Sequence, residues 1–229
     1  MIRLGIPLLE LIHPNPKGLF FFIHGHFGSK SLDSFGGLAE SIHALGFSVV
    51  SLDAYKHGER IQAPYILNDP VLTTIEMVSV IEQTLKDIVM LYQGYYQYQT
   101  KQVSILGISM GGHIAFLLNR YLSLDYCIPI IGSPNLKLHY DTKKKPFLGS
   151  NLATLETKLD ELKLLKTEFN PKHAFVLEGE WDDVVSYEPA QHFIQSFNHD
   201  AYVYKGYACG HELTKTMIQD IITFVRSKL

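Results

Sequence analysis

The chain is poor in the features that mark disulfide-stabilised, metal-binding and membrane-embedded proteins. Its 229 residues include two cysteines, Cys127 and Cys209, whose separation fits neither a metal site nor a redox pair. No apolar run approaches the length of a membrane span, and residues 1–12 lack the apolar core and cleavage site of a signal peptide. We therefore expect a reduced, cytoplasmic protein with no membrane partner.

The sequence also lacks a large excess of either positive or negative charge. The 20 basic and 23 acidic residues give a formal net charge of −3, and no block of like charge exceeds Lys143-Lys144-Lys145. A protein that binds nucleic acid needs a basic stripe, which this sequence lacks, so we predict no nucleic-acid partner. We expect the lysine triplet to lie on a solvated loop, with a role in binding an anion as the alternative.

What the sequence does contain is a regular alternation of strand-like and helix-like segments. The apolar run Leu19 to Ile23 is continuous, as a central parallel strand requires. Ile2 to Ile12 is expected to add an edge strand, because Pro7 cannot donate a ladder hydrogen bond. The other predicted strands are Phe47 to Leu52, Val103 to Leu106, Cys127 to Ile131, Ala174 to Leu177 and Ala201 to Tyr204.

The helical segments fill the gaps between these strands. Gly46 is expected to end the first helix, and Thr73 with Glu76 fits a capping box that opens the second. The alternation predicts a single α/β domain, residues 1–229, with a mostly parallel sheet and helices on both faces. The predicted helices are Ser31 to Leu45, Thr73 to Tyr92, His113 to Tyr121, Asn151 to Leu165, Tyr187 to Phe197 and Glu212 to Lys228.

The alternation breaks between residues 133 and 171. This stretch contains several turn residues and one charged helix, in which Leu155, Leu159 and Leu162 share a face. An insertion here would lie over the carboxyl ends of the strands, where open α/β sheets bind ligands. We interpret it as a small cap insertion, and the alternative is a surface helix that does not meet the substrate.

The most informative motif follows the strand Val103 to Leu106. Its sequence is Gly107-Ile108-Ser109-Met110-Gly111, and a helix comes directly after it. Such a strand–turn–helix junction exposes the serine Oγ, and a Cβ on either flanking glycine would collide with the neighbouring helix or strand. Ser109 is therefore a candidate nucleophile.

A serine hydroxyl becomes reactive when a base removes its proton and a third group orients that base. An acidic turn containing Asp182 and Asp183 follows one predicted strand, and His211 follows the last one. Gly210 is expected to let the backbone bring the imidazole close to the nucleophile turn. Taken singly, each acid or the histidine could instead cap a helix, but the order serine, acid, histidine favours a catalytic triad.

Residues 24–30 supply a further element, a turn after the first central strand. Acyl transfer places negative charge on the former carbonyl oxygen, and losing one hydrogen-bond donor to that oxygen costs about 3 kcal/mol in another enzyme. We expect the N–H groups of His26 and Met110 to be these donors. His24 and His26 could also suggest a metal site, but a third ligand is missing, so we predict neither metal nor cofactor.

Together these segments resemble the α/β-hydrolase-fold serine hydrolases, and among them the small bacterial carboxylesterases near the dienelactone-hydrolase and prolyl-oligopeptidase-like branches. The resemblance implies Ser109 as nucleophile, His211 as base and Asp182 as the orienting acid, three residues after the turn glycine. The matching segments run from about residue 19 to the end of the chain: His24 to Lys30, Asp53 with His57 to Arg60, Gly107 to Gly112, Gly179 to Asp182 with Val185, and Gly210-His211. Asp53, His57 and Arg60 are implied to be structural.

The sequence departs from the family pattern at two positions. His26 stands where similar esterases often have Phe, and Ser186 stands where Pro is common. Neither position removes a reacting group, since His26 is expected to contribute only its backbone N–H. Dienelactone hydrolases use a cysteine nucleophile, so the serine at position 109 speaks against that narrower activity.

We therefore expect a serine carboxylesterase that cleaves small or medium acyl esters through an acyl-enzyme. Its partner would be a small-molecule ester, with Phe27 and Trp181 beside the substrate and Tyr65 and Phe147 as further candidates for the pocket wall. The alternatives are a peptidase, amidase or thioesterase with the same triad, and a non-catalytic binding protein on the same fold. The sequence does not indicate the oligomeric state.

Overall fold

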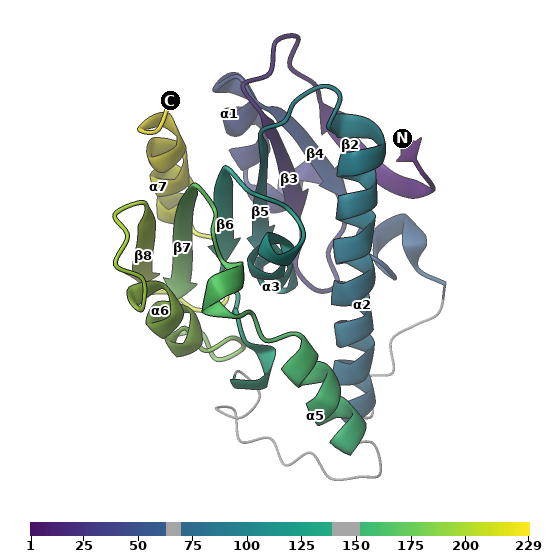
Figure 1. The fold of residues 1–229 in the computed structure, drawn as a ribbon, viewed down its shortest axis with the longest axis vertical. Coiled ribbons are helices and arrows are strands. Elements are labelled where there is room, and N and C mark those ends of the chain that lie inside the picture. Colours follow the sequence, from purple (N-terminus) through teal and green to yellow (C-terminus); the bar gives the residue numbers. More distant parts are fainter. Residues whose placement is uncertain (63–69, 139–151) are drawn as a thin grey trace.

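The computed structural model describes residues 1–62, 70–138 and 152–229, and the centre of the fold is an eight-stranded sheet (Figure 1). The strand order is β1-β2-β4-β3-β5-β6-β7-β8. β1 and β2 are antiparallel to their neighbours, and β3 to β8 run parallel. The strands are β1 (Ile2–Arg3), β2 (Ile6–Leu11), β3 (Leu19–Ile23), β4 (Ser48–Leu52), β5 (Val103–Ile108), β6 (Tyr126–Ile130), β7 (His173–Gly179) and β8 (Tyr202–Tyr207).

Helices cover both faces of the sheet, as predicted (Figure 1). Buried residues of α1 and α7 belong to one apolar layer, and those of α2, α3, α5 and α6 belong to the other. The helices are α1 (Leu38–Ala44), α2 (Pro70–Leu91), α3 (Met110–Leu117), α5 (Leu152–Glu161), α6 (Glu188–Gln195) and α7 (Lys215–Arg226). The shorter helical turns are η1 (Leu32–Phe35), η2 (Gly58–Arg60), the π-helical η3 (Tyr92–Tyr96), η4 (Leu118–Arg120) and η5 (Lys166–Glu168).

β3 holds the two apolar layers together. All five of its side chains are buried: Leu19, Phe21 and Ile23 face one layer, and Phe20 and Phe22 face the other. Successive strand residues point to opposite faces, so a strand with helices on both sides must be apolar at every position. The prediction of a central parallel strand here is confirmed, because β3 pairs in parallel with both β4 and β5.

The N-terminal strand is a hairpin. β1 and β2 are joined by a turn at Leu4-Gly5, and β1 covers only the start of β2. Pro7 pairs with Ile2 near this end, and its carbonyl oxygen accepts the N–H of Asp53 at 3.0 Å. The rest of β2 forms the edge next to β4, so the edge position predicted from Pro7 applies to that part of the strand.

The first predicted helix was wrong in one respect, because residues 31–45 do not form one continuous helix. Gly36 and Gly37 both adopt left-handed backbone angles, with φ of +58° and +83°, and separate η1 from α1. A Cβ on Gly36 would lie 2.8 Å from Ile218 Cδ1, so the break also permits close packing against α7. Gly46 lies just beyond α1 with φ of +100°, as expected of a residue that ends a helix.

Other helix ends also differ from the prediction, and two of them bear on the capping residues. α2 begins at Pro70, so Thr73 lies inside the helix and the predicted capping box is wrong. Proline suits the first helical turn because its missing N–H has no acceptor there. α7 begins at Lys215, after Thr214, whose Oγ1 accepts the N–H of Met217 at 3.1 Å. The real cap is therefore three residues beyond His211, which leaves the imidazole available for another role.

The segment at 133–171 is described in part. Residues 139–151, including the lysine triplet and Phe147, lie outside the described residues. The leucines predicted to share a helix face are Leu155 and Leu159 in α5 and Leu162 directly after it, and all three are buried in the same layer as residues of α2. Lys158 of α5 lies 4.0 Å from Glu82 of α2. The described part of this segment therefore packs along α2.

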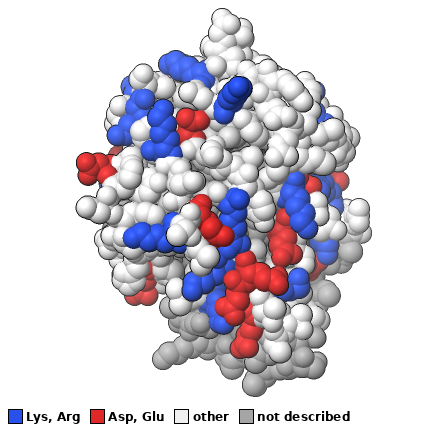
Figure 2. Space-filling model, viewed as in Figure 1, with Lys and Arg blue, Asp and Glu red and all other residues white. Residues whose placement is uncertain are grey.

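The surface carries both signs of charge. Figure 2 shows basic and acidic side chains interleaved on the face that it displays, and pairs such as Arg120 with Glu168 and Lys137 with Asp160 contribute to this pattern. Cys127 and Cys209 are both buried and unbridged. Within residues 1–62, 70–138 and 152–229, we find no helix that combines the length and apolar character needed to cross a bilayer.

Candidate active site

Ser109 occupies a strained turn between β5 and α3. Its φ of +56° and ψ of −114° place a non-glycine residue in a region that L-amino acids rarely adopt. A Cβ on Gly107 would lie 1.9 Å from the oxygen of Gly111, and one on Gly111 would lie 2.1 Å from the oxygen of Ile23 in β3. The prediction that both glycines are needed for close packing is therefore confirmed.

His211 lies within hydrogen-bonding distance of Ser109. Its Nε2 is 2.9 Å from Ser109 Oγ, and its side chain is 24% exposed. The two residues are 102 positions apart in the chain. They meet because parallel strands place their carboxyl ends at one edge of the sheet, where β5 precedes the serine and β8 precedes the histidine.

Asp182 completes this chain of hydrogen bonds. Its Oδ2 is 2.7 Å from His211 Nδ1, while its Oδ1 accepts the backbone N–H groups of Val184 at 2.7 Å and Val185 at 2.9 Å. Burial alone would raise the pKa of Asp182, but the bond to His211 and the two backbone donors outweigh it, and the pKa lies below its ordinary value. The carboxylate is therefore ionised near neutral pH and fixed in orientation.

The close backbone approach at this site occurs at Gly179 rather than at Gly210. A Cβ on Gly179 would lie 2.5 Å from the oxygen of Gly210 and 2.8 Å from that of Cys209. A Cβ on Gly210 would be 4.0 Å from its nearest neighbour, the oxygen of Trp181, which is an ordinary contact. The steric role predicted for Gly210 is thus wrong, because it is the end of β7 that presses against the loop carrying His211.

The loop after β3 lies against the serine turn. A Cβ on Gly25 would be 3.4 Å from Ser109 Cβ and 4.0 Å from its Oγ, which puts the backbone before His26 next to the nucleophile. Met110 is the first residue of α3, and N–H groups in the first turn of a helix have no acceptor within that helix. Both predicted donors thus belong to backbone segments that border Ser109.

His24 holds the start of this loop through two hydrogen bonds. Its Nδ1 donates to the oxygen of Gly25 at 2.7 Å, and its Nε2 accepts the N–H of Ala54 at 3.1 Å. Burial lowers the pKa of His24 to about 4, so the ring is neutral and holds one tautomer. His24 therefore has a structural role. Within the described ranges no group of three or more His, Cys, Asp or Glu side chains is arranged to hold a metal ion.

Asp53 holds the same loop from its other end. Its buried carboxylate accepts the backbone N–H of Lys30 at 2.7 Å and of Glu59 at 3.0 Å, and it pairs with the Lys30 ammonium at 3.0 Å. Arg60 donates to the Asp53 carbonyl oxygen at 3.1 Å and pairs with Asp87 at 2.6 Å. Burial would raise the pKa of Asp53, but the donors from Lys30 and Glu59 outweigh it and lower the pKa. The contacts of Asp53 and Arg60 agree with the scaffold role that the sequence implied.

A cavity of about 420 Å³ opens above Ser109. Phe27 lines it with a side chain that is 66% exposed, while Trp181 is 71% exposed and does not line it, so the structure gives no support to that pocket assignment. Tyr65, like Phe147, lies outside the described residues. The described lining consists of Gly25, His26, Phe27, Ser34, Ile108, Ser109, Ile131, Val184, His211, Glu212 and Leu213.

Several of these lining residues were not predicted from the sequence. Glu212 directly follows His211, so its proximity to the site was available from the chain order. Ser34 gave no such signal, because its place at the cavity depends on the η1 turn and the glycine break after it. The described residues of the 133–171 segment contribute nothing to the lining, so they give the cap prediction no support.

Glu178 was also missed, although a carboxyl group inside the apolar strand β7 is itself a signal. Its side chain is fully buried, and Oε1 accepts the N–H of Gly132 at 3.2 Å. Burial raises the pKa of Glu178 well above its ordinary value, despite that hydrogen bond. The apolar surroundings of Glu178 therefore favour the uncharged form of its carboxyl group.

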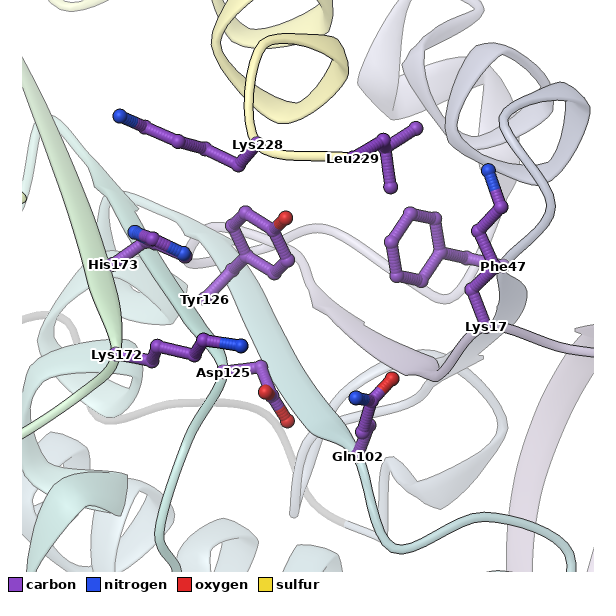
Figure 3. A pocket seen from close by; sticks show the side chains of 9 residues that line it. All are labelled: Lys17, Phe47, Gln102, Asp125, Tyr126, Lys172, His173, Lys228 and Leu229. Atoms are coloured by element: carbon purple, nitrogen blue, oxygen red, sulfur yellow. The ribbon is translucent and has the colours of Figure 1, made fainter.

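A second hollow, of about 280 Å³, lies at the opposite edge of the sheet (Figure 3). It is bordered by Tyr126 and His173 at the starts of β6 and β7 and by Lys228 near the end of the chain. No serine, threonine or cysteine is among its described lining residues. The arrangement of nucleophile, base and acid therefore distinguishes the cavity at Ser109 from this hollow.

The anchoring role of Asp53 predicts a pH-dependent loss of stability. A carboxylate with a lowered pKa stabilises the fold above its unfolded pKa and loses that contribution as the pH falls through its folded pKa. The Asp53→Asn variant should therefore be less stable than the parent by about 1–3 kcal/mol at pH 7, and the difference should shrink below about pH 4. Denaturant unfolding at pH 7 and pH 3.5 measures both values. A difference that is equal at the two pH values would rule out the charged form of Asp53 as its cause.

No protein-family model matches the chain, and a search of curated proteins found no match. Solved structures do resemble it. TT1662 of Thermus thermophilus aligns with a TM-score of 0.79 and 19% identity over 97% of this chain and 93% of that one. The esterase Pf2001 of Pyrococcus furiosus gives 0.65 and 15%, over 97% and 92%. Mouse alpha/beta hydrolase domain-containing protein 10 gives 0.67 and 15%, over 100% and 96%.

These similarities concern the architecture, since all three identities are below a fifth. They do not distinguish the dienelactone-hydrolase branch or the prolyl-oligopeptidase-like branch from other relatives. The strand order, the parallel sheet covered by helices and the structural neighbours agree, and the chain has the α/β-hydrolase fold.

Proposed function

We propose that this protein is a serine carboxylesterase that hydrolyses small or medium acyl esters through an acyl-enzyme. The observation that carries the proposal is the continuous hydrogen-bonded chain from Asp182 through His211 to Ser109, with distances of 2.7 Å and 2.9 Å. This chain ends at a hydroxyl that borders a cavity with several apolar walls. Nucleophile, base and orienting acid are thus within reach of one another and of a bound ester.

In the first half-reaction Ser109 Oγ attacks the ester carbonyl carbon while His211 Nε2 takes the hydroxyl proton. The C=O bond becomes a C–O⁻ bond in the tetrahedral intermediate. When that intermediate collapses, the protonated His211 gives its proton to the departing alcohol, and the acyl group remains on Ser109. Asp182 keeps Nδ1 protonated and stabilises the imidazolium, which lets Nε2 act as the base.

The second half-reaction repeats these steps with water as the nucleophile. His211 removes a proton from the water, the hydroxide adds to the acyl carbon, and collapse of the intermediate releases the carboxylic acid and restores the Ser109 hydroxyl. In both halves the oxyanion would be bound by the N–H groups of His26 and Met110. The proximity of Gly25 to Ser109 and the position of Met110 at the start of α3 support these donors.

The same triad could cleave amides or thioesters, and the fold also occurs in non-catalytic binding proteins. The complete hydrogen-bonded triad argues against a binding protein, which does not need a base aligned on the serine. Ester cleavage is favoured by the likeness to the Pyrococcus furiosus esterase. A peptidase, amidase or thioesterase remains the second candidate because it would use the same three residues.

Replacing the nucleophile tests the reaction directly. The Ser109→Ala variant should lose about a thousandfold or more of its activity toward p-nitrophenyl acetate and butyrate, because the acyl-enzyme cannot form. It should also fail to react with a fluorophosphonate probe that labels the parent protein. Spectrophotometric rates and probe labelling measure the two effects, and undiminished turnover by the variant would end the proposal.

The adjacent residues Asp182 and Asp183 allow a matched test of which acid orients His211. Asp182→Asn should reduce kcat by about a hundred- to ten-thousandfold, because the amide no longer holds the imidazole in the required tautomer. Asp183→Asn, one residue further along an exposed turn, should change kcat less than about threefold. Steady-state kinetics with p-nitrophenyl butyrate separates the two. Equal losses in both variants would contradict the assignment of Asp182.

A comparison of three bond types tests the substrate class. A simple ester, an acyl-CoA and an aminoacyl-nitroanilide supplied at equal concentration should be cleaved in that order of kcat/KM, with the ester ahead by about tenfold or more. Ser109→Ala serves as the blank for each substrate. A larger kcat/KM for the thioester or the anilide would replace carboxylesterase with the corresponding alternative.

A further inference from the structure

The two loops that bring the acid and the base to Ser109 are negatively charged. Residues 180–187 follow β7 and residues 208–214 follow β8. Their formally charged side chains are all carboxylates, and neither loop contains lysine or arginine. The residues are Glu180, Asp182, Asp183 and Glu212. The substrate therefore enters beside an excess of negative charge.

Glu212 is the carboxylate that borders the cavity itself. Phe27, Ile108, Ile131, Val184 and Leu213 provide apolar surface around it, and the described lining contains no other acidic side chain and no lysine or arginine. Glu212 is exposed at the mouth and forms no ion pair with any residue of the described parts of the chain. Apolar walls of low polarisability strengthen the field of such a charge inside a cleft.

Two basic side chains of the loop after β3 do not offset this charge. The ammonium group of Lys30, in the loop after β3, lies 3.0 Å from Asp53 and 2.5 Å from Glu59, so two carboxylates already neutralise it. His26 lines the cavity, but burial, together with the neighbouring His57, lowers its pKa to about 4, and the ring is uncharged at pH 7.

We propose that this site selects uncharged and cationic esters against anionic ones, with Glu212 as the residue that sets the preference. The inference rests on the proposed esterase function and adds the charge of its substrate. An ammonium group on the alcohol or acyl part of the ester would lie close to Glu212, in a cavity whose described lining contains no other acidic side chain and no lysine or arginine. A carboxylate or sulfonate in the same place would be repelled and would find no lysine or arginine among the described residues that line the cavity.

The test compares three butyrate esters that differ in the charge of the alcohol part. They are butyrylcholine, its uncharged isostere 3,3-dimethylbutyl butyrate, and the butyrate ester of 3-hydroxypropanesulfonate. We expect kcat/KM at pH 7.5 and low salt to be about three- to tenfold higher for the cation than for the isostere, and lower by a similar factor for the anion. The cation-to-neutral ratio should fall as sodium chloride rises from 20 mM to 500 mM.

Two substitutions at position 212 test whether Glu212 causes the charge preference. Glu212→Gln should reduce the cation-to-neutral ratio at least threefold and remove most of its salt dependence, and Glu212→Lys should invert the order of cation and anion. Glu180→Gln is the matched control, because Glu180 is an exposed carboxylate of the neighbouring loop that does not line the cavity, and it should shift the ratio less than twofold. Fluorophosphonate labelling of each variant verifies that its site is folded.

The outcomes separate the two proposals. Equal kcat/KM for the three esters in the parent protein, or an unchanged cation-to-neutral ratio in Glu212→Gln, overturns the charge preference. If hydrolysis of the neutral ester still depends on Ser109 in that case, the esterase proposal stands. Hydrolysis of the neutral ester that survives Ser109→Ala overturns the esterase itself.

Discussion

The arrangement of the site depends on how closely the chain packs around the turn at Ser109. The serine backbone is held at positive φ, and the glycines two residues before and after it are in contact with backbone atoms that leave no room for a Cβ. A strained residue persists only when its surroundings fix it, and here β3, β5 and α3 do so together. The result is a hydroxyl that projects from the carboxyl edge of the sheet, beside the first N–H groups of a helix.

The parallel sheet then brings distant residues to this hydroxyl. Because β5, β7 and β8 all run in the same direction, the loops that follow them emerge at the same edge. Asp182 is fixed there by two backbone donors as well as by His211, so its orientation does not depend on the imidazole alone. Asp53 and His24 hold the loop after β3 in place from opposite ends. The loops after β7 and β8 also carry the carboxylates beside the cavity. The segments that position the acid and the base are therefore the ones to which we assign the charge preference.

Much of this could be predicted from the sequence, for physical reasons. A strand buried on both faces must be apolar throughout, which identified β3, and steric demands on glycine identified the serine turn. The order serine, acid, histidine left Asp182 and Asp183 as candidates, and the resemblance to the α/β-hydrolases, whose acid stands three residues after the turn glycine, indicated Asp182. Other features depend on contacts between distant residues. The break at Gly36-Gly37 reflects packing against Ile218, and the close approach at Gly179 depends on the loop beside it. The cavity lining at Ser34 and Ile131 likewise follows from the packed fold and not from any local pattern.

The decisive experiment is the structure of a covalent fluorophosphonate adduct, because its phosphoryl group imitates the tetrahedral intermediate. We expect phosphorus bonded to Ser109 Oγ, with the phosphoryl oxygen about 3 Å from the backbone nitrogens of His26 and Met110. An adduct on any other residue, or a phosphoryl oxygen directed away from both nitrogens, would contradict this arrangement.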